Sequence, residues 1–256
     1  MSPRSEAAFL RCRGITKRFG GMVALRDVTF DVERASLVGL IGPNGAGKTT
    51  LLSVINGLLR PEEGVVELEG ERISGLPAHV VTRRGVGRVL QIPRLFPRLT
   101  VEENVLVGAL FGRPGRVSWQ EAQRRTEEAL SLVGMERKRG EVVGKLNTQE
   151  RRLVDLARAL AAGPRLLLVD ELMSGLSPVE IEQCTALLRR IRQELGMTIL
   201  WVEHVMEAVL GTVDRVIVLD HGAVIADGPP ARVAQDPVVV EAYLGVSMHE
   251  LEGARG

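Results

Sequence analysis

The sequence predicts an α/β fold built on a mostly parallel β-sheet. Three uninterrupted apolar runs, at residues 37–42, 166–171 and 198–204, are typical of parallel strands that are buried on both faces. A helical pattern follows each run, which predicts strand–helix–strand units and a doubly wound sheet. The 256 residues are 45% hydrophobic and 25% charged, a composition typical of a folded soluble protein with one large core.

The segments around these strands predict two attached units. Residues 9–34 and 62–73 alternate polar and apolar side chains between glycine-rich turns, which predicts an N-terminal antiparallel β subdomain. Residues 93–162 are mostly helical in pattern, begin with the proline-rich IPRLFPRLT and are interrupted at GRPGR. This pattern predicts an inserted α-helical subdomain.

The domain boundaries follow from these patterns. We expect one main domain over residues 8–228 and a short C-terminal tail over 229–256. The tail carries a short helical pattern near 238–244. Neither internal repeats nor low-complexity segments divide the chain further.

Charge and cysteine content exclude several classes of partner and chemistry. A net charge of +1 gives no case for nucleic acid or for a charged membrane surface. No run approaches the roughly 18 apolar residues of a membrane span, and the N-terminus lacks a signal-peptide core, which favours the cytosol. Cys12 and Cys184 lie in a strand-like and a helical apolar pattern, so we expect both to be small core residues.

The strand at 37–42 leads into GPNGAGKTT, which fits the spacing G-x-x-x-x-G-K-[ST]. Glycines let backbone N–H groups turn inward around a phosphate, and the following helix offers its N-terminus. With the parallel sheet, this motif predicts a P-loop NTPase with a RecA-like core that binds ATP. The alternative is a glycine-rich turn without a ligand. The expected nucleotide-binding residues here are Gly42, Pro43, Asn44, Gly45, Ala46, Gly47, Lys48, Thr49 and Thr50.

Within this motif Lys48 would reach the β- and γ-phosphates, and Thr49 would hold Mg²⁺. Two acids, Asp170 and Glu171, end the second apolar run. Asp170 is placed to bind Mg²⁺, as the corresponding acid does in P-loop NTPases, and Glu171 to orient or deprotonate a water. The alternative is that the two acids only open a loop.

Three further positions have both a functional and a structural interpretation. His204 ends the third apolar run, where it would contact a γ-phosphate, although a lone histidine is more often structural. Gln91 precedes Pro93, and its amide would contact Mg²⁺ or water, or neither. Phe19, before a Gly-Gly turn, would stack on adenine or fill the core, and its position alone favours the core.

The segment LNTQERRLVDLARAL predicts a well-formed helix. Leu153, Leu156, Ala157 and Leu160 recur at helical spacing and form an apolar stripe. Asn147 is the expected N-cap residue, and Glu150 stands three residues later, where a capping-box acid belongs.

The motifs RFGG, GPNGAGKTT, QIPRLFP, LARAL, LLLVDELMSGLSP and WVEH follow one another in an order that resembles the nucleotide-binding subunit of an ABC transporter. The resemblance covers about residues 9–245. Segments such as LQIPRLFPRLTVEENVLVGA and VEHVMEAV are similar to one ATPase subunit of the branched-chain amino-acid importers. This family implies a second ATPase, two membrane permeases, and indirectly a periplasmic binding protein. It also implies a peripheral location on the cytoplasmic face of the inner membrane.

The resemblance assigns a role to each motif. Phe19 matches the aromatic residue that stacks on adenine, and Gln91 matches the Q-loop glutamine that faces the metal, the water and the permease. Glu171 matches the catalytic carboxylate and His204 the switch histidine. The segment SGLS at 174–177 matches the D-loop, except that Ser177 stands where the family usually has Asp.

The signature segment departs further from the family. ABC dimers close the LSGGQ segment of one subunit over ATP held by the other. Here Asn147, Thr148, Gln149 and Glu150 replace Ser, both glycines and Gln. Side chains therefore stand where the backbone should approach phosphate closely. We expect this chain to close poorly over its partner's ATP, and hence to work in an asymmetric heterodimer.

Three alternatives to an amino-acid importer subunit remain open. The first is a transport ATPase of similar sequence with a different cargo, such as urea, amides or an exported lipid. A soluble ABC protein of DNA repair or translation usually carries two cassettes or a coiled-coil insertion, and this chain shows neither. A weakly hydrolysing regulatory half is favoured by the LNTQE segment and opposed by Glu171 and His204.

Overall fold

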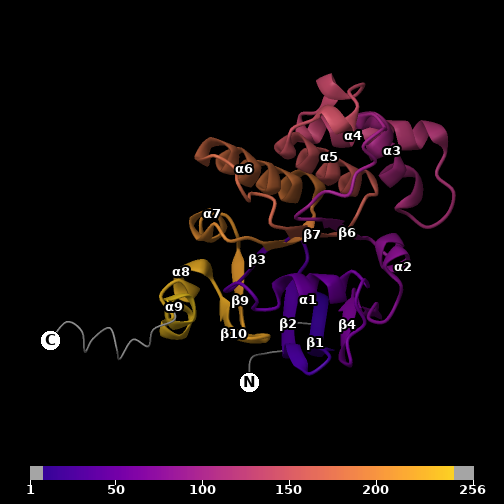
Figure 1. Ribbon diagram of the computed structural model, residues 1–256. Helices are drawn as coiled ribbons and strands as arrows, with labels where there is room; N and C mark the ends of the chain where they lie inside the picture. Colours follow the sequence, from indigo (N-terminus) through magenta and orange to yellow (C-terminus); the bar gives the residue numbers. More distant parts are fainter. Residues whose placement is uncertain (1–7, 245–256) are drawn as a thin grey trace.

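A six-stranded sheet lies at the centre of the fold in the computed structural model, which describes residues 8–244 (Figure 1). Neighbouring strands from β9 to β6 are parallel, and only β10 pairs antiparallel with β9. The order across the sheet is β10 (Ala223–Gly228), β9 (Arg215–Asp220), β3 (Leu37–Ile41), β8 (Thr198–Val202), β7 (Leu166–Asp170) and β6 (Val86–Val89). The mostly parallel sheet is therefore confirmed.

The three uninterrupted apolar runs form β3, β7 and β8, and every residue of these strands is buried. Successive side chains point to opposite faces, so each strand contributes to two separate cores. On β7, Leu167 and Val169 belong to one core and Leu166 and Leu168 to the other. This double burial is the physical reason that the runs are continuous rather than alternating.

A four-stranded antiparallel sheet covers one face. Its order is β2 (Met22–Glu33), β1 (Ala8–Phe19), β4 (Glu63–Leu68) and β5 (Glu71–Arg72). β1 and β2 have 12 residues each, longer than the short strands that the alternation predicts, and a Gly20-Gly21 turn joins them. Helix α1 (Lys48–Ile55) shares one core with both sheets.

Three helices, α3 (Val101–Phe111), α4 (Trp119–Val133) and α5 (Thr148–Ala161), pack against one another on the other side (Figure 1). Two 3₁₀ turns, Glu136–Lys138 and Val143–Lys145, connect α4 to α5. α3 begins with a capping box between Thr100 and Glu103, and the side chain of Ser118 caps α4. The inserted helical unit is thus present.

The remaining helices connect the strands or follow them. They are α2 (Ala78–Arg83), α6 (Pro178–Leu195), α7 (Met206–Leu210), α8 (Pro230–Val233) and α9 (Pro237–Leu244). α9 lies where the tail pattern predicts a helix, and its Val239 is buried in the main core. The predicted tail beyond residue 244 lies outside the described residues. Within residues 8–244, no helix has the length and apolar character needed to span a membrane.

Both cysteines are buried and unbonded, as the sequence predicts. Burial raises the pKa of the Cys184 thiol to about 11 and raises that of Cys12 further. Neither thiol is a thiolate at neutral pH, so both act as small core residues.

Candidate functional site

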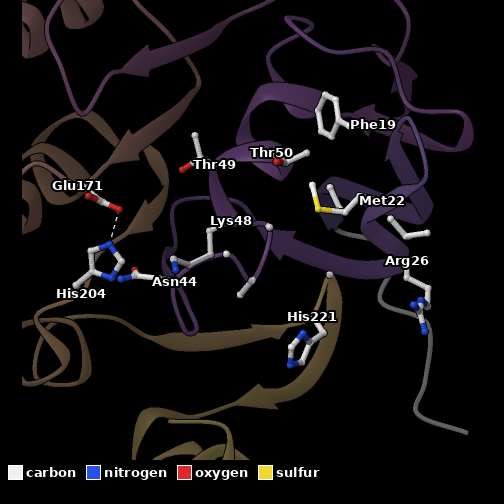
Figure 2. Close-up of a pocket in the computed structure, with 16 residues that line it drawn as sticks. Phe19, Met22, Arg26, Asn44, Lys48, Thr49, Thr50, Glu171, His204 and His221 are labelled. Carbon is white, nitrogen blue, oxygen red and sulfur yellow. Dashed lines mark hydrogen bonds and ion pairs between the residues drawn. The ribbon is translucent and has the colours of Figure 1, made fainter. Parts of the chain in front are cut away.

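The carboxyl ends of β3, β7 and β8 meet at one edge of the sheet and open onto a cavity of about 510 Å³. The loop after β3 forms one wall, and Glu171 and His204, after β7 and β8, form another (Figure 2). This is the edge where open α/β sheets bind ligands. Side chains that line the cavity include Phe19, Met22, Arg26, Asn44, Lys48, Thr49, Thr50, Glu171, His204 and His221.

The loop at 42–47 is tightly confined at two of its glycines. A Cβ atom on Gly42 would lie 1.9 Å from the Leu219 carbonyl oxygen, and one on Gly47 would lie 2.6 Å from the Ala24 carbonyl oxygen. Gly45, between them, has φ of +81° but faces open space. The first and last glycines are thus required for packing, and Gly45 leaves its backbone accessible from the cavity.

Lys48 begins helix α1 and is buried. Its Nζ donates to the carbonyl oxygens of Gly42 and Pro43, at 2.7 and 2.9 Å. Burial lowers the pKa of Lys48, and the nearby carboxylates of Glu171 and Asp170 oppose that shift. No side chain caps α1, and no acid stands in its first turn. The N-terminus of α1 therefore offers free N–H groups and a cation to an anion.

Asp170 is almost fully buried at the end of β7. Thr49 Oγ1 donates to Asp170 Oδ1 at 3.3 Å, which joins two of the three predicted Mg²⁺ ligands. Arg88, on β6, donates through Nη2 to Asp170 Oδ2 at 2.8 Å. The sequence holds no local signal for Arg88, because its partner lies 82 positions further along the chain.

Glu171 is the meeting point of three predicted catalytic side chains. Gln91 Nε2 donates to one of its carboxylate oxygens, and His204 Nε2 contacts the other (Figure 2 shows the contact with His204). The three residues follow β6, β7 and β8, which are neighbours in the sheet. In this arrangement the Gln91 amide is hydrogen-bonded to Glu171 and is not joined to Thr49 and Asp170, the other two predicted Mg²⁺ ligands.

Phe19 lies at the β1–β2 turn, 44% exposed, on the far side of the cavity from Glu171 and His204 (Figure 2). The core interpretation of Phe19 is therefore wrong, and its ring is free to contact a ligand. Lys17 Nζ lies 5.4 Å from the centre of this ring. Met22 and His221 line the same cavity from hairpin turns, and the sequence held no local signal for either.

The signature segment at 147–150 lies outside this cavity, at the N-terminus of α5. Asn147 Oδ1 accepts from the Glu150 N–H at 2.9 Å, and Glu150 Oε2 accepts from the Asn147 N–H at 3.0 Å. This confirms the predicted capping box. Lys138 Nζ lies 2.6 Å from the other oxygen, Glu150 Oε1, and this contact and the Asn147 N–H lower the pKa of Glu150.

Two buried charges hold the segment after Glu171. Arg152, on α5, donates through Nη1 to the carbonyl oxygens of Leu172 and Ser174, at 3.2 and 2.5 Å. On the other side, Glu203 Oε1 accepts from the Met173 N–H at 2.6 Å, and burial raises the Glu203 pKa. Residues 172–174 are thus held from α5 and from β8. Ser177 caps α6 through Glu180.

The sheet ends at a glycine loop, a helix without a side-chain cap, a buried lysine, and a Glu171 that contacts Gln91 and His204. This combination defines a P-loop NTPase. Family comparison makes this more specific. The family model described as ABC transporter matches residues 25–174, so the chain belongs to that family and is an ABC transporter ATPase. A second model, described as branched-chain amino acid ATP-binding cassette transporter, matches residues 223–249.

Individual relatives cover nearly the whole chain. The chain is 38% identical over 248 residues to the high-affinity branched-chain amino acid transport ATP-binding protein BraF of Pseudomonas aeruginosa, which covers 92% of this chain and 97% of BraF. It is 36% identical over 236 residues to the lipopolysaccharide export system ATP-binding protein LptB of Acidithiobacillus ferridurans, covering 92% and 96%.

A solved cassette has the same fold. The dimeric post-hydrolysis state of the ATP-binding cassette MJ0796, bound to ADP and Pi, matches with a TM-score of 0.78 and 28% identity, covering 86% of this chain and 98% of that one. The expected fold class and family are both confirmed.

Proposed function

We propose that this chain binds and hydrolyses Mg²⁺-ATP to power an importer of branched-chain amino acids. The observation that carries the hydrolytic part is the Glu171 carboxylate, held by Gln91 and His204 at the edge of the cavity. Both donors orient the carboxylate, and each oxygen keeps a lone pair for a water. Catalytic carboxylates of phosphoryl transfer are positioned in this way.

The rest of the cavity suits a nucleoside triphosphate. Backbone N–H groups of the glycine loop and of the N-terminus of α1 would bind the phosphates, and Lys48 would release its two loop carbonyls to reach the β- and γ-phosphates. The exposed ring of Phe19, on the far side of the cavity, would stack on adenine. His204 would contact the γ-phosphate.

The residues near Asp170 fit a magnesium ion. Asp170 Oδ1 and Thr49 Oγ1 lie together, and Mg²⁺ is bound in nucleotide enzymes by one or two such oxygens with water and phosphate oxygens. Gln91 would join them through its amide oxygen only after leaving its position beside Glu171. When bound, the ion would neutralise charge that develops on the transferring phosphoryl group.

Replacing Glu171 by Gln tests the hydrolytic role. The variant keeps the shape of the side chain but cannot accept a proton, so we expect ATP turnover to fall by about 100-fold or more. Binding of a fluorescent ATP analogue should persist. Glu127→Gln, on the exposed side of α4, is the matched control and should turn over normally. Normal turnover in the Glu171 variant would remove Glu171 from this role.

The signature segment supports an asymmetric heterodimer as the working unit. The N-terminus of α5, which would face the partner's ATP, is already satisfied by Asn147 and Glu150. Two copies of this chain would therefore form two weak sites. A second ATPase with an intact glycine signature would close over the strong site formed by Lys48, Glu171 and His204.

The cargo proposal rests on the C-terminal family model and on the name of BraF. In this proposal two permeases anchor the chain at the cytoplasmic face of the membrane, the Gln91 segment passes ATP-driven closure to a permease, and a periplasmic protein delivers the amino acid. The second candidate is lipid export, which the similarity to LptB favours. The branched-chain amino acid model that matches residues 223–249 supports the importer instead.

Reconstitution tests the partners and the cargo together. We expect a slow ATPase for the chain alone, and a rate about tenfold higher or more once the second ATPase and two permeases are added, because closure completes the catalytic site. Vesicles holding that complex should accumulate leucine when the binding protein and ATP are supplied. Full-rate hydrolysis by the isolated chain as an ATP-bound homodimer would refute the heterodimer. Lipid extraction without leucine uptake would support the second candidate.

A further inference from the structure

Arg88 and Asp170 form a buried ion pair beside the cavity. Nη2 of Arg88 lies 2.8 Å from Asp170 Oδ2, and the two side chains are only 8% and 3% exposed. Nη1 of Arg88 donates to Ser53 Oγ at 3.0 Å, and Ser53 Oγ donates to the Thr49 carbonyl oxygen at 2.7 Å. Arg88 therefore connects β6 to both α1 and β7, the two elements that carry Thr49 and Asp170.

The two oxygens of Asp170 have different partners. Oδ1 accepts from Thr49 Oγ1 and Oδ2 accepts from Arg88. A carboxylate this deeply buried needs a compensating charge even when no metal is bound. Within the described residues, Arg88 is the cation that forms an ion pair with it. The same guanidinium opposes the approach of a second cation, because like charges repel strongly where water is scarce.

We infer that Arg88 is a positioning residue that sets the order of binding at this site. It holds Asp170 in place before nucleotide arrives, and it keeps Asp170 from capturing a divalent cation on its own. The phosphates of an incoming nucleotide carry enough negative charge to offset the guanidinium, so the metal binds together with the nucleotide. This inference rests on the proposed function, since it takes Asp170 as the metal ligand.

The structure separates this role from simple packing. A packing residue would affect stability but leave the affinity of Asp170 for a metal unchanged. Arg88 Nε is buried without a hydrogen-bond partner among the described residues, and the hydrogen bonds of the guanidinium go to Ser53 and Asp170. The guanidinium is thus held chiefly by the groups that surround the metal ligands.

Manganese binding to the full chain without nucleotide gives the test, measured by electron paramagnetic resonance of the free ion. We expect wild-type protein to bind Mn²⁺ weakly, and Arg88→Met to bind it about tenfold or more tightly, because the repelling charge is gone. Arg88→Lys keeps the charge and should resemble wild type. The matched control is Arg84→Met, which removes an exposed arginine paired with Glu71.

The double variant Arg88→Met/Asp170→Asn locates the ion. It should lose the added Mn²⁺ affinity, because the carboxylate that captures the ion is gone. Arg88→Met alone should melt at a lower temperature in EDTA and recover on addition of Mn²⁺, whereas the double variant should melt higher than Arg88→Met in EDTA. If Arg88→Met fails to fold, Arg88→Gln, which still donates to Asp170, provides the neutral variant.

The proposal fails if Arg88→Met or Arg88→Gln binds Mn²⁺ with wild-type affinity, or if Mn²⁺ restores no stability. Both results would make Arg88 a packing residue. The proposed function has a separate readout, the binding of a fluorescent ATP analogue to wild-type protein with Mg²⁺. Loss of that binding would overturn the function, whereas the Mn²⁺ series uses no nucleotide.

Discussion

Single residues at this site differ in how strictly their surroundings determine them. Gly45 and Gly47 are two positions apart, and both have a positive φ. Yet a Cβ atom meets nothing within 4 Å at Gly45, whereas at Gly47 it would lie 2.6 Å from the Ala24 carbonyl oxygen and 2.9 Å from Leu25 Cδ2. The loop thus combines one position limited only by its backbone angle with one limited also by packing.

This difference predicts unequal effects of one substitution. Gly45→Ala should lower the free energy of unfolding by about 1 kcal/mol, the usual cost of a side chain at a positive φ. Gly47→Ala should cost more, about 2 kcal/mol or more, because β2 must also move. Urea unfolding measures this free energy of unfolding, and titration with a fluorescent ATP analogue measures nucleotide affinity separately. Equal losses in both variants would contradict the packing argument.

Site residues that mark the end of a strand were predictable from the sequence, whereas those defined by a distant partner were not. Asp170, Glu171 and His204 follow long apolar runs, so their place at one edge of the sheet was predictable. Arg88 sits in the four-residue strand β6, and nothing near it announces Asp170. The position of Phe19 alone favoured the core, and only the family resemblance assigned it to adenine, because exposure depends on how the β1–β2 turn meets the glycine loop.

Among the elements, helices α1 and α5 differ in how their N-termini are capped. α1 begins at Gly47 without a side-chain cap and without an acid in its first turn. α5 begins with the Asn147–Glu150 capping box, and Lys138 neutralises Glu150. Because an exposed helix N-terminus attracts anions, α1 remains open to a ligand, whereas α5 is satisfied by its own side chains.

The Glu150 contacts predict a pH-dependent contribution to stability. Lys138 and the Asn147 N–H lower the folded pKa of Glu150 below its ordinary value of 4.5. The stabilisation is therefore complete above the unfolded pKa and is lost as the pH falls through the lower folded value. Wild type should exceed Glu150→Gln in stability near neutral pH, and the gap should close on acidification.

Asn147→Ala supplies the comparison for this pH series, since asparagine does not titrate. It should cost about 1 kcal/mol, the typical loss of an N-cap, at every pH tested. Urea unfolding of the three proteins between neutral pH and about pH 3 measures both effects. A Glu150→Gln deficit that stayed constant over this range would show that the Lys138 contact does not act through charge.

Elements differed in how well the sequence predicted them. The fully buried strands β3, β7 and β8 are continuous apolar runs and helix α5 has an apolar stripe, and the structure has them within two residues of the expected bounds. Strands β6, β9 and β10 were not predicted. β6 is four residues long with Arg88 inside it, and β10 pairs only at the edge of the sheet, so both are stabilised mainly by neighbouring strands.

At the scale of the whole molecule, the chain joins two sheets and a helical unit through shared cores. The parallel sheet separates two apolar clusters, one shared with the antiparallel sheet and α1, the other with helices α3 to α6. Class and overall architecture were predictable because they depend on periodicity summed over many residues. The domain limits at 8–228 and 229–256 stay predictions, and Val239 shows that the tail contributes to the main core.

The hydrogen bonds that hold residues 172–174 from two sides bear on when ATP is hydrolysed in a transporter. Arg152 of helix α5 donates hydrogen bonds to this segment from one side. Glu203, which follows β8 and precedes His204, accepts a hydrogen bond from it on the other side. If the proposed partner subunit displaces α5, we expect the displacement to reach the residues that flank Glu171 and His204. We expect a chain with a weak signature to keep this mechanical link. ATP binding at the weak site would then set the timing of hydrolysis at the strong site and contribute little hydrolysis of its own.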